Sequence, residues 1–226
     1  MNGYRFASVI LLFLAGAASA ATPAVEAEFA SAATARTESP VRAAANRALR
    51  DFAAQWQGQA GTLPRGFPFD VKDVADLAGA RIGYGFRVHD ADPAGLAAGD
   101  SLDASARDIG QWRFNVVLAG RPIGLITLVE EGGTWQAVSF GGSRLAAEID
   151  AVVQASPGAT LRYVRVLQAT ADFIEVGAGK NARYAPLQAA RESLRLASTA
   201  RGSDGLVADV ELSAQLREGV ARNLAE

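Results

Sequence analysis

The chain contains no cysteine and only one histidine, His89, among its 226 residues. Without cysteine it cannot build a disulfide, a thiol nucleophile, an iron–sulfur cluster or a cysteine-ligated zinc site. One histidine is too few for most histidine-based metal sites and proton relays. We therefore expect no metal and no cofactor, and we expect burial of apolar surface alone to stabilise the fold.

The chain also has little excess charge of either sign. Its 22 lysines and arginines nearly balance 24 aspartates and glutamates, which gives a net charge of −2 at pH 7. A chain so close to neutral has no bulk attraction to nucleic acid or to an anionic membrane. We therefore expect no nucleic-acid partner.

The first twenty residues have the pattern of an export signal. Arg5 precedes an apolar run from Ala7 to Ala17, and Ala18-Ser19-Ala20 supplies the small residues of a cleavage site. The run is shorter than the roughly 20 residues that span a bilayer, and no stop-transfer segment follows it. The sequence therefore predicts a signal peptide at 1–20, no stable membrane insertion, and a secreted or periplasmic bacterial protein.

The rest of the chain divides by composition into a leader, a helix, a linker and a domain. Residues 21–38 predict a flexible leader, because they are rich in alanine, threonine and glutamate. Ser39 and Pro40 have the form of an N-cap and a first helical residue, and they open an amphipathic helix over 39–58. The remaining segments are a linker at 59–69, an α+β domain at 70–200 and a C-terminal extension at 201–226, which we expect to be helical.

The domain pattern predicts an α+β fold with an antiparallel sheet of five or six strands. Short turns join three of the strands into a β-meander, because parallel pairing needs a longer crossover. A helix, two strands and another helix follow, which places helices on a face of the sheet. The expected strands are Phe86–His89, Trp112–Val117, Ile123–Val129, Trp135–Phe140, Leu161–Leu167 and Asp172–Val176. The other expected segments are a helix Asp70–Gly79 capped by Asp70, a polar loop Pro93–Asp108, a helix capped by Ser143 and a helix Pro186–Ala197.

The same periodicity predicts the core. Residues of the meander and of the following helix that we expect to be buried are Trp112, Phe114, Ile123, Leu125, Trp135, Val138, Leu145 and Ile149. The helix at 39–58 has its own apolar face of Val41, Ala45, Leu49, Phe52 and Trp56. This face must dock on the domain or on a partner, because an isolated helix of this length is marginal in water. We expect self-docking, and Phe52 and Trp56 are the candidate interaction residues if a partner is bound instead.

Ser139 is the best candidate nucleophile. The segment Ala137–Gly141 is similar to the G-x-S-x-G nucleophile elbow of α/β-hydrolases, with alanine for the first glycine. That elbow needs a parallel sheet and a histidine that follows the nucleophile, whereas hairpins surround Ser139 and the only histidine, His89, precedes it. We therefore expect Ser139 and His89 to be catalytically silent, with a serine hydrolase as the alternative.

Two further patterns resemble binding sites only in part. The five aspartates from Asp90 to Asp108 have no EF-hand register, so they predict a solvated loop rather than a calcium site. The glycine-rich segment 177–181 lacks the first glycine and the Ser or Thr of a phosphate loop. Lys180, Arg183 and Tyr184 could still form a small anion-binding rim.

The sequence as a whole favours an exported, non-enzymatic module that binds a macromolecule or a small ligand. The reason is that the chain supplies a compact scaffold but no base, thiol, metal cluster or phosphate loop. The expected partner is a protein in the periplasm or the extracellular space. The alternatives are a serine hydrolase using Ser139, an enzyme with a pair of catalytic carboxylates, and an accessory module that folds or inhibits a co-secreted enzyme.

Overall fold

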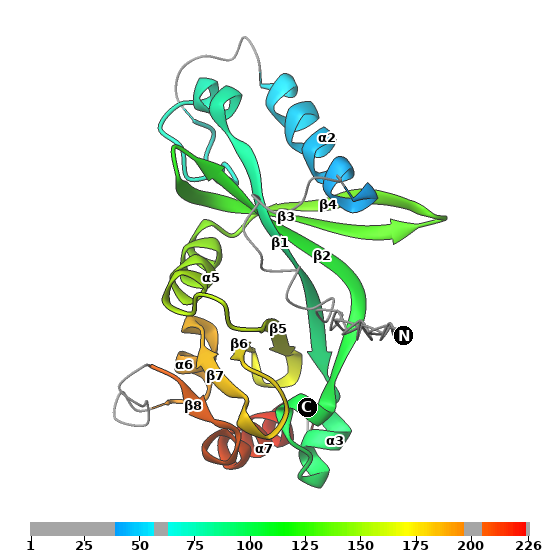
Figure 1. Cartoon of the computed structure of the whole chain (residues 1–226), viewed down its shortest axis with the longest axis vertical. Helices are drawn as coiled ribbons and strands as arrows, with labels where there is room; N and C mark the ends of the chain where they lie inside the picture. Colours follow the sequence, from blue (N-terminus) through cyan, green and yellow to red (C-terminus); the bar gives the residue numbers. More distant parts are fainter. Residues whose placement is uncertain (1–38, 57–62, 197–204, 225–226) are drawn as a thin grey trace, which may run out of the picture.

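The structure, a computed structural model, describes residues 39–56, 63–196 and 205–224. The expected signal peptide at 1–20 and leader at 21–38 lie outside these residues. The described residues form an α+β fold, in which helices cover both faces of one open, mostly antiparallel sheet (Figure 1). The elements are α2 (Pro40–Gln55), η1 (Val74–Gly79), β1 (Arg81–Ala91), α3 (Pro93–Ala98), α4 (Leu102–Ser105), β2 (Ala106–Leu118), β3 (Arg121–Glu131), β4 (Thr134–Gly141), α5 (Ser143–Ala155), β5 (Leu161–Val166), η2 (Leu167–Ala169), β6 (Ala171–Val176), η3 (Gly179–Asn181), β7 (Arg183–Pro186), α6 (Gln188–Ser193), β8 (Val207–Ala208) and α7 (Asp209–Leu224).

The sheet has two halves that meet at one parallel strand pair. Its strand order is β4-β3-β2-β1-β5-β6-β7-β8. All neighbouring strands are antiparallel except β1 and β5, which pair in parallel over three residues. The predicted meander of β2, β3 and β4 is therefore confirmed, and β1 extends it. The long strands β1 and β2 run from the end that carries α2 to the end that carries α3 (Figure 1).

The expectation of five or six strands is too low, because β7 and β8 lack a pattern of their own. Strand β7 is only four residues long and ends in Pro186, where a helix was expected to begin. Strand β8 has two residues. Both form because each extends an existing edge, β7 on β6 and β8 on β7. The helix that follows β7 therefore starts at Gln188 instead.

The polar loop expected at Pro93–Asp108 is also wrong. The segment contains the helices α3 and α4 and the first residues of β2. Local capping explains both helices. The side chain of Asp92 accepts a hydrogen bond from the N–H of Ala94 at 3.0 Å, and Ser101 accepts one from Ala104 at 3.1 Å.

Of the three expected N-caps, one is confirmed and two are displaced. Ser39 caps α2, which ends at Gln55 rather than at 58. Asp73, not Asp70, caps η1, while Asp70 forms an ion pair with Arg121. The N-cap of α5 is Gly142, whose left-handed backbone suits glycine, so Ser143 is the first residue of the helix and not its cap.

Helices lie on both faces of the sheet. Neighbouring residues of a strand face opposite sides, so Ile126 packs toward α2 and η1 while Leu125 packs against Ile149 of α5. In the other half of the sheet, Val164 packs with Leu216 of α7. In the C-terminal segment, Asp209–Leu224 form the helix α7, whose apolar face belongs to the core.

Helix α2 docks on its own chain. Val41, Ala45 and Leu49 are buried in one cluster with residues of β2 and β3. The guanidinium of Arg42 donates a hydrogen bond to the carbonyl of Gly83 at 2.6 Å, which ties the start of α2 to β1. The structure therefore shows α2 docked on its own chain.

Most of the predicted core is buried, with one error. Phe114, Ile123, Leu125 and Ile149 are buried, while Trp112, Trp135 and Leu145 are half-buried. Val138 is wrong, because its side chain is 55% exposed. The register explains this: Ser139 pairs with Thr127 and Ala137 with Leu128, so Val138 is the extra residue of a β-bulge.

Candidate functional site

The two edges of the sheet differ greatly in how open they are. Strand β4 forms one edge, has eight residues, and contains neither a charged residue nor a proline. Strand β8 forms the other edge, has only two residues, and runs directly into α7. Natural sheets protect their edges with charges, prolines, bulges or very short strands. Strand β8 is protected by its short length, whereas the described residues give β4 only the bulge at Val138.

The hairpin register shows which backbone groups of β4 face the open edge. Glu131 pairs with Thr134 across the turn Gly132-Gly133, and both glycines have positive φ. This is the geometry of a two-residue hairpin, in which the residues that flank the turn exchange hydrogen bonds. Because pairing alternates along an antiparallel ladder, the backbone N–H and C=O groups of Trp135 and Ala137 point away from β3.

A groove lies beside this edge, between β4 and α2. It has a volume of about 340 Å³. Its lining residues are Ala44, Arg47, Ala48, Asp51, Phe52 and Gln55 of α2, and Trp135, Gln136, Ala137 and Phe140 of β4. Six of the lining residues are alanine or aromatic, and the other four are polar or charged. We call this site the α2–β4 groove.

The bulge shapes the β4 wall of the groove. In a regular strand Phe140 would face the opposite side from Trp135 and Ala137, because side chains alternate. The extra residue Val138 shifts this alternation, so all three pack toward α2. Phe140 then stacks on Phe52 with a ring-centroid distance of 4.8 Å. The error in predicting Val138 and the shape of the groove thus have the same cause.

Two opposite charges line the α2 wall. Arg47 and Asp51 lie one helical turn apart, and neither has a hydrogen-bond or ion-pair partner among the described residues. Because residues four positions apart lie on the same side of a helix, both side chains are at the mouth of the α2–β4 groove. The groove therefore offers one cation and one anion together, without a net charge.

The interaction candidates from the sequence take two different roles. Phe52 is half-buried and lines the α2–β4 groove. Trp56 is also half-buried, and its ring packs edge-on against Phe67 at 5.2 Å. Both side chains therefore help α2 dock on its own chain, and of the two only Phe52 also reaches the groove.

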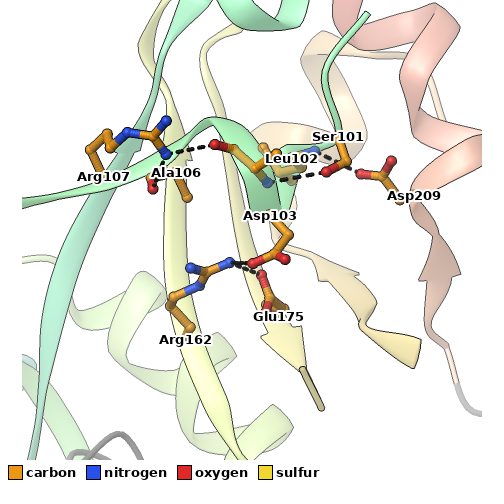
Figure 2. Close-up of polar contacts among 9 residues, drawn as sticks. Ser101, Leu102, Asp103, Ala106, Arg107, Arg162, Glu175 and Asp209 are labelled. Carbon is orange, nitrogen blue, oxygen red and sulfur yellow. Dashed lines mark hydrogen bonds and ion pairs between the residues drawn. The ribbon is translucent and has the colours of Figure 1, made fainter. Parts of the chain in front are cut away.

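A second polar site lies at the β1–β5 junction and centres on Arg162. The guanidinium of Arg162 contacts Glu175 at 2.5 Å and forms an ion pair with Asp103 of α4 (Figure 2). Glu175 is 3% exposed and pairs across the ladder with both Arg162 and Tyr184. Nearby, Asp209 of α7 accepts a hydrogen bond from the N–H of Leu102 at 2.9 Å (Figure 2).

The opposite face of β5 carries a matching network. Arg165 binds both carboxylate oxygens of Asp90 at 2.8 and 3.1 Å. Arg113 donates a hydrogen bond to the hydroxyl of Tyr163 at 3.1 Å, and Asp172 lies beside both Tyr163 and Arg165. One strand thus sends an arginine to each face, and each arginine bridges elements of the two halves of the sheet.

The ionisation of these groups follows from their burial. Burial raises the pKa of Glu175, although the charge and hydrogen bond of Arg162 lower it. Burial likewise raises the pKa of Asp172 against the opposing effect of Tyr163 and Arg113. Glu175 has the guanidinium of Arg162 in contact, which is the arrangement of a structural ion pair, and the positive charges of Arg113 and Arg165 act on Asp172. We therefore interpret both networks as bonds that hold the two halves of the sheet together.

The structure separates the two catalytic candidates. Ser139 is exposed on β4, whereas His89 lies on β1, and the strands β3 and β2 stand between them. His89 is half-buried, and burial, followed by the positive charge of Arg162, lowers its pKa. His89 is therefore neutral at pH 7, and it is not placed to take a proton from Ser139.

The remaining sequence candidates do not meet at one site. Tyr184 is buried beside Glu175, whereas the guanidinium of Arg183 donates a hydrogen bond to the carbonyl of Leu206 at 2.8 Å and Lys180 is exposed. An anion-binding rim of these three residues is thus not supported. Among the described residues, no cluster of three or more Asp, Glu or His side chains is arranged to hold a metal ion.

Sequence reasoning missed most of the α2–β4 groove. Arg47 and Asp51 lie outside the apolar face of the helix, and nothing in the local pattern shows that the end strand of the meander lies beside them. The absence of charge in β4 was visible in the sequence, and it could have indicated the open edge. Comparison with protein-family models, with curated proteins and with solved structures finds no significant match, and in the described parts of the chain no helix is long and apolar enough to cross a membrane.

Proposed function

We propose that this is an exported, non-enzymatic protein-interaction module that binds an extended polypeptide strand along the edge of β4. The single observation that carries the proposal is an uncharged, eight-residue edge strand beside a groove with aromatic and small side chains. Export rests on the signal-peptide pattern of residues 1–20.

The physical basis is strand addition. An added strand would satisfy the outward backbone groups of Trp135 and Ala137, and these hydrogen bonds would supply affinity without regard to sequence. Every second side chain of the added strand would enter the α2–β4 groove, where the walls select its size. The open charges of Arg47 and Asp51 would add selectivity for a strand with polar groups at matching positions.

Of the alternatives, the accessory module is close to this proposal, whereas the serine hydrolase differs from it in kind. An accessory module that folds or inhibits a co-secreted enzyme would use the same edge and differ only in the identity of its partner. A serine hydrolase would need a base near Ser139, whereas the only histidine lies on β1, with β2 and β3 between them.

A random-peptide phage library tests the proposal without a known partner. Selected peptides should bind the wild-type protein and bind Ala137→Pro about tenfold more weakly or worse, because proline removes an outward N–H group. The matched control is Ala137→Val, which adds a similar volume but keeps the N–H and should retain binding. A selection whose peptides bind Ala137→Pro and the wild type equally well would contradict strand addition at β4.

A further inference from the structure

We infer that the strand added to β4 is the β4 strand of a second copy of this chain, in a twofold-symmetric dimer with one continuous sheet. This inference rests on the proposed function, because it names the partner of the same edge. Three observations support it: the symmetry of the outward backbone groups of β4, the positions of Arg47 and Asp51 along α2, and the protection of the opposite sheet edge at β8.

The free backbone groups of β4 are symmetric about Gln136. The outward groups belong to Trp135 and Ala137, which lie one residue before and one residue after it. An antiparallel contact with a second β4, centred on Gln136, places Trp135 of each copy opposite Ala137 of the other. Each such pair can exchange two hydrogen bonds, so the contact forms four bonds. The segment involved is the regular part of β4, before the bulge at Val138.

The two open charges have the order that such a contact needs. A twofold axis through the β4 edge brings the α2 helices to the same face of the joined sheet and makes them antiparallel. If the axis is level with the midpoint between Arg47 and Asp51 on α2, Arg47 of one copy faces Asp51 of the other, and the reverse pair forms at the same time. Within one described chain neither side chain has a partner, so the contact satisfies two charges that the monomer leaves open.

The opposite edge explains why the assembly closes at two copies. A filament would require β8 of one copy to pair with β4 of the next. Strand β8 has only two residues, and Asp209 directly after it is tied to the backbone of Leu102. Among contacts between copies of this chain, the twofold contact therefore suits β4 best, and the small net charge of −2 opposes it little.

Sedimentation equilibrium of the purified protein, with four variants, tests the dimer. The wild type should show a reversible equilibrium between one and two monomer masses as concentration rises. Ala137→Pro should weaken association about tenfold or more, since outward hydrogen bonds are lost at both ends of the contact. Arg47→Glu and Asp51→Arg should each weaken association to a similar degree, because each makes like charges face each other. The double variant Arg47→Glu/Asp51→Arg restores opposite charges and should associate within about threefold of the wild type.

The outcomes separate this inference from the proposed function. A wild type that stays monomeric up to about 0.5 mM, or a double variant no better than the single ones, would overturn the dimer. If the chain is monomeric but library peptides still bind in a way that Ala137→Pro abolishes, the partner is a different polypeptide and the proposed function stands. If Ala137→Pro changes neither self-association nor peptide binding, both proposals fail. Thermal unfolding of each variant checks that a loss of association is not a loss of fold.

Discussion

The contribution of an ion pair to the stability of this fold depends on how deeply the pair is buried. The ion pair of Arg121 with Asp70 is mostly exposed, and pairs of that kind stabilise a fold by about 0–1 kcal/mol. Arg162, in contrast, is in contact with Glu175, which is almost fully buried. Removing one partner of a buried pair leaves an uncompensated charge and costs about 3–5 kcal/mol. A single substitution at Arg162 should therefore be far more harmful than one at Arg121.

The buried carboxyl group of Glu175 should make stability depend on pH. Its pKa in the folded state is raised above the ordinary 4.5, first by burial. The folded state therefore holds this proton more tightly, so the stability it contributes is fully present below pH 4.5 and is lost as pH rises through the raised pKa. We would measure the free energy of unfolding in urea for the wild type and for Glu175→Gln from pH 4 upward. As pH rises through the raised pKa, the wild type should lose stability relative to the variant. A difference that stays constant, or that falls with pH, would refute this assignment.

Ser139 should be catalytically silent. It is exposed on an edge strand, and the two strands β3 and β2 separate it from the only histidine. A serine without a base is a poor nucleophile. A fluorophosphonate probe should therefore leave Ser139 unlabelled, and Ser139→Ala should not change any esterase activity of the purified protein. Stoichiometric labelling at Ser139 would support a hydrolase and would contradict a purely non-enzymatic function.

At the scale of the elements, sequence patterns predicted the helices and strands that local sequence encodes. They missed the features that depend on how one strand pairs with another. The meander and the capped start of α2 followed from alternation, short turns and the Ser39-Pro40 pair. Strand β7 could not be predicted, because Arg183–Pro186 is short, ends in proline, and forms only through its pairing with β6. The bulge at Val138 could not be predicted either, because it is a property of the β3–β4 register and not of the β4 sequence.

The two faces of the meander give a matched test of the core. Leu125 and Ile149 are buried, and both belong to the apolar cluster between the sheet and α5. Replacing either with alanine should lower the free energy of unfolding by about 2–5 kcal/mol, because methylenes are lost and a cavity remains. Val138→Ala is the control, and it should cost less than about 0.5 kcal/mol because the side chain is mostly exposed. A large loss at Val138, or small losses at both core positions, would show that the faces are misassigned.

Helix α2 should be as well protected as the sheet that it covers. Val41, Ala45 and Leu49 are buried, and Phe52 packs on Phe140 of β4. Hydrogen exchange on the isolated protein should therefore be slow from Ala43, whose N–H is bonded to the carbonyl of Ser39, to Leu49, and faster toward both ends of the helix. Rapid exchange through the whole helix would mean that α2 does not dock stably, and the α2–β4 groove would then lose one wall.

At the scale of the whole molecule, the least predictable feature is the joining of the two halves. The parallel pairing of β1 with β5 connects residues 75 positions apart, such as Val88 and Tyr163, and no local pattern indicates it. Arg162 and Arg165 reinforce this short junction on opposite faces, which the sequence could not show because their partners lie on other elements. The α2–β4 groove is a similar case, since two segments far apart in sequence supply its walls.

The central claim is that the β4 edge accepts an added strand, and the backbone amides of Trp135 and Ala137 test it most directly. At about 1 µM their exchange with deuterium should be fast, because they face solvent in the monomer. At about 0.5 mM, or with a saturating peptide from the library, both should become protected, while the amide of Gln136, which faces β3, should be slow throughout. Fast exchange of Trp135 and Ala137 under every condition would contradict the account.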